Sequence, residues 1–205
     1  MAKLYFKYGA MACGKTTALL QVVYNYKKNG FNVLLVKPTI DRKGGNTVTS
    51  RLGVSREVDV LLDGNESLSD KVNLDDVDSI VVDEAQFMTP KQIDELWIIS
   101  KVYNIPVIAY GLKSNFQGHL FEGSKALFEK ADCFDELVTI CSCGKKARFN
   151  ARRLGDEYTL EGEEVAIDGI DAIYESLCPE CYVNKVFILQ FKFHYLPGSS
   201  IIYWF

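Results

Sequence analysis

The chain has no long hydrophobic run, and its overall charge is not basic. No stretch of about 18 consecutive apolar residues occurs, the length that a membrane-spanning helix requires, so we expect no membrane partner. No long apolar segment precedes a small-residue cleavage site near the N-terminus, so we expect no secretory signal and a cytoplasmic location. With 23 basic and 27 acidic residues, the formal net charge is -4. Nucleic-acid-binding domains usually present a basic face, so we expect no nucleic-acid partner.

Histidine is scarce, but six cysteines are present. The two histidines lie too far from the cysteine pairs in sequence to be expected as metal ligands. In a reducing compartment, closely spaced cysteines more often bind metal than each other. Four thiolates form the closed tetrahedral site typical of structural zinc, and a set of reduced, unliganded thiols is the alternative interpretation. The candidate zinc ligands form two close pairs, Cys141 with Cys143 and Cys178 with Cys181.

Short apolar runs alternate with helical patterns in the first two thirds of the chain. This alternation predicts an α/β fold, in which helices cover both faces of a mostly parallel sheet. A polar segment rich in Gly, Ser and Thr, residues 42–59, is expected to be a mobile loop. The expected strands are 4–8, 33–36, 79–83, 106–110 and 136–140, and the expected helices are 16–28 and 90–103.

A phosphate-binding loop (P-loop) is predicted between the first strand and the first helix. The segment 9–16 matches G-x-x-x-x-G-K-[ST] at every fixed position. The glycines let backbone N–H groups turn toward nucleotide phosphates, Lys15 supplies positive charge to the β- and γ-phosphates, and the Thr16 hydroxyl is a ligand for Mg²⁺. The residues assigned to ATP binding by this motif are Gly9, Ala10, Met11, Ala12, Cys13, Gly14, Lys15 and Thr16.

Two carboxylates follow the buried apolar run 79–82. In an open parallel sheet, ligands bind at the carboxyl ends of the strands. Asp83 is therefore a candidate to bind Mg²⁺, through a water, and Glu84 to accept a proton from the group that attacks the γ-phosphate. These residues do not distinguish a kinase from an ATPase, because Glu84 could activate either a hydroxyl or a water.

The motifs together resemble those of the thymidine kinase family, in the zinc-containing cellular form also found in many bacteria. The resemblance covers about residues 2–185 and rests on the P-loop, on DEAQF at 83–87, on YGLKSNFQG at 110–118, and on VAIDG at 165–169 with Tyr174. It implies that the γ-phosphate of ATP is transferred to the 5′-hydroxyl of deoxythymidine, giving dTMP for DNA synthesis. By position, Glu84 becomes the general base, and Asp83, Glu84, Ala85 and Gln86 join the ATP-binding residues.

The resemblance also implies a pocket for the thymine base and the sugar. Backbone groups of the segment 165–169 would hydrogen-bond the base edge, and Asp41 and Arg42 would face the sugar and phosphate, with Lys43 as a competing candidate. Asn115 departs from the family pattern, because many bacterial relatives have Asp there. The implied substrate-binding residues are Phe87, Leu112, Phe116, Phe121, Val165, Ala166, Ile167, Asp168, Gly169, Tyr174, Asp41 and Arg42.

The composition changes after Cys141 to short, turn-rich segments, so we place a domain boundary near Thr139. We expect a P-loop nucleotide-binding domain over residues 1–139 and a zinc-binding domain over 140–186, which carries the lasso that closes over the base. Residues 187–205 form an atypical apolar tail, outside the family resemblance. The resemblance implies a homotetramer and feedback inhibition by dTTP.

Three alternative functions remain open at this point. A kinase of the same fold could act on another deoxynucleoside. A P-loop ATPase or binding module would hydrolyse ATP without thymidine. A structural or regulatory zinc protein with a silent P-loop would fail to bind ATP.

Overall fold

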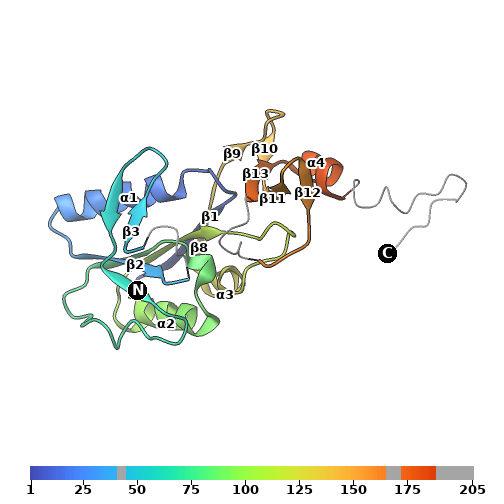
Figure 1. Ribbon diagram of the computed structural model, residues 1–205. Helices are drawn as coiled ribbons and strands as arrows, with labels where there is room; N and C mark the ends of the chain where they lie inside the picture. The colour runs from blue at the N-terminus through green and yellow to red at the C-terminus, as the bar shows by residue number, and fades with distance from the viewer. Residues whose placement is uncertain (41–44, 165–171, 188–205) are drawn as a thin grey trace, which may run out of the picture.

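The computed structural model describes residues 1–40, 45–164 and 172–187 (Figure 1). Its larger part is a six-stranded sheet with the order β5-β2-β6-β7-β1-β8, and every neighbouring pair of strands is parallel. The strands are β1 (Leu4–Gly9), β2 (Val33–Pro38), β5 (Val60–Leu62), β6 (Ser79–Val82), β7 (Val107–Leu112) and β8 (Cys133–Leu137).

Helices pack on both faces of this sheet, as the alternating sequence pattern predicts (Figure 1). On one face, Leu19 of the first helix packs with Leu35 of β2 in a buried cluster. On the other face, Leu96 and Leu127 of two further helices share a second cluster with Phe6 of β1. These elements are α1 (Lys15–Lys28), α2 (Pro90–Val102), α3 (Glu122–Lys130) and the short 3₁₀ helix η2 (Ala85–Phe87). None of the helices among the described residues is long and apolar enough to cross a membrane.

The carboxyl ends of the parallel strands meet at one edge of the sheet, and local sequence signals place the site segments there. The P-loop follows β1, and Gly14 turns the chain into α1 with a left-handed φ of 81°. The helix η2 follows β6 after two residues, Asp83 and Glu84. Helix α2 then begins at a capping box, in which Thr89 and Gln92 exchange hydrogen bonds and Pro90 occupies the first turn.

The structure corrects two sequence expectations. The segment expected to be a loop, 42–59, contains a hairpin of β3 (Thr47–Thr49) and β4 (Ser55–Glu57), and Val48 is buried in the cluster on the α1 face. The last strand of the main sheet is 133–137 rather than 136–140. It is an edge strand with exposed polar residues, so it has no apolar run to mark it.

A smaller unit follows the main sheet and lies beside it (Figure 1). It carries the four cysteines expected to bind zinc, and we call it the zinc-binding unit. It has a three-stranded antiparallel sheet of order β12-β11-β13, a two-stranded sheet and its own small core. Its elements are β9 (Thr139–Ile140), β10 (Lys146–Ala147), β11 (Phe149–Leu154), β12 (Glu157–Thr159), β13 (Ala172–Leu177), α4 (Pro179–Tyr182) and the π-helix η3 (Val183–Phe187).

Candidate functional site

The P-loop connects the end of β1 to the start of α1, as its motif predicts. Lys15 is 9% exposed, and its ammonium donates a hydrogen bond to the carbonyl of Ala10 at 2.9 Å and lies 3.6 Å from the Cys13 sulfur. Ala12 adopts a left-handed φ of 57°, a conformation that residues other than glycine rarely adopt. The backbone therefore curls around the lysine ammonium, which places a positive charge inside the loop.

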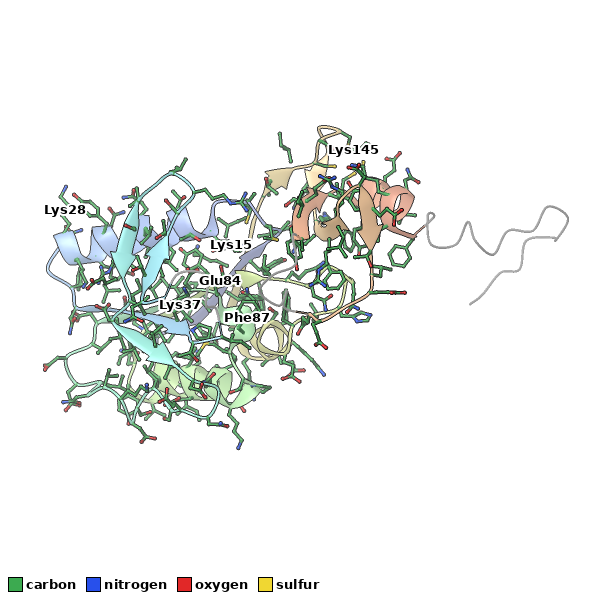
Figure 2. All side chains as sticks on the ribbon, viewed as in Figure 1. Lys15, Lys28, Lys37, Glu84, Phe87 and Lys145 are labelled. Carbon is green, nitrogen blue, oxygen red and sulfur yellow. The ribbon has the colours of Figure 1, made fainter. Side chains whose placement is uncertain are left out.

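Glu84 is the second residue after β6 and has a left-handed conformation, with φ 49° and ψ 38°. Such a conformation in a non-glycine residue costs free energy, and it is found preferentially at functional sites. Figure 2 shows Glu84, Lys15 and Phe87 at the same edge of the sheet, and all three line one cavity. Asp83, the preceding residue, is 5% exposed.

Gln86 fixes the orientation of the Glu84 carboxylate. Its side-chain N–H donates to Glu84 Oε2 at 2.5 Å, and its Oε1 accepts from the backbone N–H of Leu112 at 3.0 Å. A side chain at Gly111 would lie 2.9 Å from Gln86 Oε1, and one at Gly123 would lie 2.5 Å from the Ala85 carbonyl. Glycine at both positions therefore lets β7 and α3 pack closely around η2.

A single cavity of about 1010 Å³ joins the P-loop to a group of aromatic side chains. Phe87 and Phe121 meet edge to face, with ring centroids 5.5 Å apart, and Phe116 is 2% exposed. The predicted site residues that line the cavity are Met11, Ala12, Cys13, Gly14, Lys15, Thr16, Glu84, Gln86, Phe87, Leu112, Phe116, Phe121 and Tyr174. Four predicted residues are not part of this lining: Gly9, Ala10, Asp83 and Ala85. The remaining predictions lie outside the described residues: Asp41, Arg42, Lys43 and 165–169.

Arg152 was not found by sequence reasoning, although it organises the aromatic side of the site. Its guanidinium lies 3.6 Å from the centroid of the Phe116 ring, and its Nε donates to the Tyr174 hydroxyl at 2.9 Å. It also donates to the Glu163 carbonyl at 2.6 Å, and the residue is 5% exposed. An arginine within a strand is usually solvated, so only its partners mark it as a site residue.

Asn115, the departure from the family pattern, uses both ends of its amide. Its Nδ2 donates to Glu164 Oε1 at 2.9 Å, and its Oδ1 accepts from the backbone N–H groups of Gln117 and His119, each at 3.0 Å. An ionised Asp could not donate to Glu164 and would repel it. Asparagine at position 115 is therefore compatible with the Glu164 carboxylate, to which it donates a hydrogen bond.

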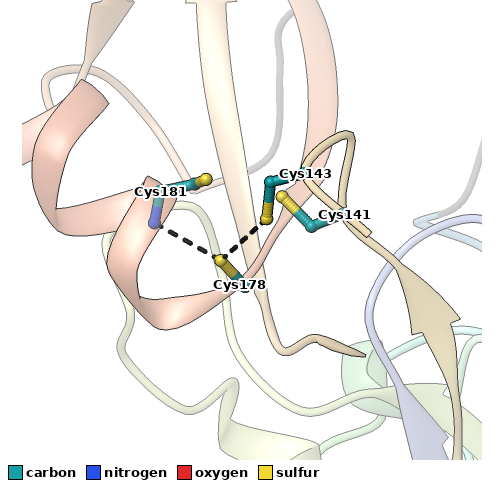
Figure 3. A group of neighbouring side chains, drawn as sticks. All are labelled: Cys141, Cys143, Cys178 and Cys181. Carbon is teal, nitrogen blue, oxygen red and sulfur yellow. Dashed lines mark hydrogen bonds between the residues drawn. The ribbon is translucent and has the colours of Figure 1, made fainter. Parts of the chain in front are cut away.

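The four paired cysteines come together in the zinc-binding unit, as the sequence predicts (Figure 3). Their sulfurs all lie within 4.8 Å of one another, and those of Cys143 and Cys178 are 3.6 Å apart. Zn–S bonds of about 2.3 Å separate tetrahedral sulfurs by roughly 3.8 Å, so this donor set is compatible with zinc. A turn at Gly144, with φ 85°, brings Cys141 and Cys143 to one side, and Cys178 caps α4 beside Cys181.

Two of these thiols, Cys141 and Cys181, have pKa values shifted in opposite directions. Burial disfavours the Cys141 thiolate, but hydrogen bonds from the backbone of Cys143 and Cys178 and from neighbouring thiols outweigh burial and lower its pKa to about 6. Hydrogen bonds to the Cys143, Cys178 and Cys141 sulfurs raise the pKa of Cys181 to about 12. An ionised Cys141 thus disfavours ionisation of Cys181, and a cation bound between the two sulfurs would offset this repulsion.

The family model and the sequence relatives indicate the same family. The family model described as thymidine kinase matches residues 2–182. The chain is 43% identical to a thymidine kinase of Chromobacterium violaceum, over 89% of this chain and 98% of that protein. It is 43% identical to a thymidine kinase of Haemophilus influenzae (90% and 98% covered) and 42% identical to one of Enterobacteria phage T4 (87% and 94% covered). Among solved structures, the Pif1 helicase of Candida albicans aligns with a TM-score of 0.39 and 14% identity, covering 66% of this chain and 36% of that one.

Proposed function

The chain belongs to the thymidine kinase family, and we propose that it transfers the γ-phosphate of ATP to the 5′-hydroxyl of deoxythymidine, giving dTMP for DNA synthesis. One observation carries this proposal: the same cavity contains Lys15 of the P-loop, Glu84, and the aromatic side chains of Phe87, Phe116 and Phe121. An ATPase needs the first two but has no need of an aromatic pocket. A nucleoside kinase needs all of them, because a base must be held while its sugar hydroxyl reaches the γ-phosphate.

At the phosphate end of the cavity, this chain supplies positive charge and oxygen ligands. Lys15 would stabilise the negative charge that is spread over the transferring phosphoryl group. The Thr16 hydroxyl and the Asp83 carboxylate are oxygen donors at the edge where the phosphates would lie, and such donors suit Mg²⁺. We assign Thr16 and Asp83 to hold the Mg²⁺ that enters with ATP and neutralises charge on its phosphates.

At the acceptor end, Glu84 is assigned as the general base. Gln86 donates to Glu84 Oε2, so Oε1 is left to accept the proton of the 5′-hydroxyl. General base catalysis is needed because the hydroxyl is otherwise protonated at neutral pH. The fixed orientation of the carboxylate reduces the reorganisation required when the acceptor binds.

At the base end, the thymine ring would stack between aromatic side chains. Phe87, Phe116 and Phe121, together with Leu112 and Tyr174, supply the apolar contact surface. We assign recognition of the base edge to backbone groups of 165–169, and contacts to the sugar and phosphate to Asp41 and Arg42. Buried backbone groups left unpaired by an ill-matched base would give the selectivity that stacking alone cannot give.

One assay tests the proposed function against its alternatives. The pure protein would be incubated with labelled ATP, Mg²⁺ and each deoxynucleoside in turn, and we expect labelled dTMP with thymidine at a rate well above that with the other nucleosides. A faster reaction with another deoxynucleoside would assign a different substrate to the same fold. ATP hydrolysis at an equal rate without any nucleoside would contradict kinase function.

We propose that zinc occupies the four-cysteine site and has a structural role. Four protein sulfurs leave no position open for a substrate, so a metal there would hold the small unit together and take no part in phosphoryl transfer. Metal analysis of freshly purified, reduced protein is expected to give about one zinc per chain. A Cys178→Ser variant should lose that zinc and unfold more readily in a melting experiment. Active parental protein without zinc would contradict the assignment.

We propose, from the family resemblance alone, a homotetramer that dTTP inhibits as a feedback regulator. From the composition of the sequence we propose a cytoplasmic location and a division into domains at 1–139, 140–186 and 187–205. Sedimentation of the purified chain would test the oligomeric state, and titration with dTTP during turnover would test the inhibition. A monomer, or an enzyme insensitive to dTTP, would contradict the respective proposal.

A further inference from the structure

The zinc-binding unit contacts the P-loop directly, through the backbone N–H and the backbone carbonyl of Met11. The Met11 backbone N–H donates to Asn150 Oδ1 at 2.7 Å, and the Met11 carbonyl accepts from the Ser176 hydroxyl at 2.6 Å. Asn150 and Ser176 are directly opposite one another on the paired strands β11 and β13. A single cross-strand pair therefore holds both hydrogen-bonding groups of Met11.

Asn150 also contacts the loop after β7, which lies between the predicted nucleoside-binding residues Leu112 and Phe116. Its Nδ2 donates to the Ser114 carbonyl at 3.2 Å, and both residues are almost fully buried, with Asn150 4% and Ser114 2% exposed. One asparagine amide thus joins the zinc-binding unit, the P-loop and the loop after β7. A second, longer contact runs from the Thr139 hydroxyl to the Ala12 carbonyl at 3.4 Å.

The strands that carry this pair are anchored close to the cysteine cluster. Ser176 precedes Cys178 by two residues, and Leu177 between them is 1% exposed in the core of the small unit. Ala151, next to Asn150, is buried in the same core with Cys141 and Cys178. The position of the pair is therefore set by the packing around the cysteines, and the pair in turn sets the position of Met11.

We infer that Asn150 and Ser176 are positioning residues that hold the P-loop at Met11 and connect the zinc-binding unit to phosphoryl transfer. This inference rests on the proposed kinase function. A loop with glycine at both ends can adopt many conformations, and ordering it when ATP binds costs affinity. Two hydrogen bonds to Met11 preorganise the loop before the nucleotide arrives. The zinc-binding unit then contributes to the ATP site as well as to the base pocket.

Variants that remove the Ser176 hydroxyl or the Asn150 amide test the inference. Ser176→Ala removes the bond to the Met11 carbonyl, and Asn150→Ala removes the bonds to Met11 and Ser114. Tyr158→Phe is the matched control: it removes a hydroxyl of the same unit that bonds to Glu175 and lies outside the cavity lining. The affinity for a non-hydrolysable ATP analogue would be measured by calorimetry, with zinc content and the affinity for thymidine measured on the same preparations.

We expect Ser176→Ala to weaken binding of the analogue by about 3- to 10-fold, the range for loss of one hydrogen bond, with zinc and thymidine affinity unchanged. Asn150→Ala should weaken binding of both the analogue and thymidine. Ser176→Thr, which keeps the hydroxyl, should restore part of the loss, and Tyr158→Phe should bind the analogue like the parent.

Two results would overturn the inference. In the first, Ser176→Ala and Asn150→Ala both bind the analogue within about twofold of the parent. In the second, Tyr158→Phe weakens binding as much as Ser176→Ala, which would mean that the whole unit has loosened. Because analogue binding does not depend on the acceptor, failure of the proposed function would be seen separately, as a parental protein that binds ATP but does not phosphorylate thymidine.

Discussion

The Lys15→Ala variant is expected to lose phosphoryl transfer almost completely while keeping its fold. Lys15 is the cation inside the P-loop, and its ammonium is held there by the Ala10 carbonyl. Removing one preorganised charge from a transferring phosphate typically costs at least about 10²–10³-fold in rate. The helix should survive, because Lys15 begins α1 and alanine has the highest helix propensity.

Steady-state turnover of thymidine and ATP, together with a melting curve, would test this result. Lys28→Ala is the matched control: Lys28 is an exposed lysine in the last turn of the same helix, at its far end (Figure 2). It should turn over like the parent. The P-loop assignment would be wrong if Lys15→Ala kept a rate within about tenfold of the parent while the nucleotide remained at saturating concentration.

The parts of the fold that could be predicted are those with a strong local signal. The apolar runs at 33–36 and 106–110 became strands of the central sheet, because strands buried on both faces require continuous apolar residues. Strand β8 and helix α3 are among the elements that lacked such a signal. Edge strand β8 carries exposed Phe134, Asp135 and Glu136, and α3 begins in a segment whose packing depends on the absence of a side chain at Gly123.

The residues of the candidate site likewise fall into those with a sequence signal and those without one. The P-loop, the carboxylates after β6 and the cysteine pairs could be predicted because their chemistry requires fixed residue types at fixed spacing. Asn150, Arg152 and Ser176 carry no such spacing. Each acquires its role only when β11 and β13 pair and face the P-loop or Phe116. A polar residue in a turn-rich sequence is usually solvated, so its burial and partners became evident only in three dimensions.

The Glu84→Gln variant is expected to turn over thymidine about 10²–10⁴-fold more slowly than the parent, the typical contribution of general acid–base catalysis. The amide keeps the shape of the side chain, and its carbonyl can still accept the hydrogen bond from Gln86. The amide cannot accept a proton at neutral pH, so the substitution should lower the rate of phosphoryl transfer and leave substrate binding unchanged.

The measurement must separate binding from chemistry, because a displaced Glu84 backbone would affect both. Residue 84 has a left-handed φ of 49°, and the substitution leaves its backbone and the length of its side chain unchanged, so thymidine should bind with nearly parental affinity. Single-turnover kinetics with preformed complex would then show a slow chemical step. Glu122→Gln, the same substitution at an exposed residue of α3, should behave like the parent. If Glu84→Gln transferred phosphate at the parental rate, the proton would be accepted by another group, because an amide at residue 84 cannot take it.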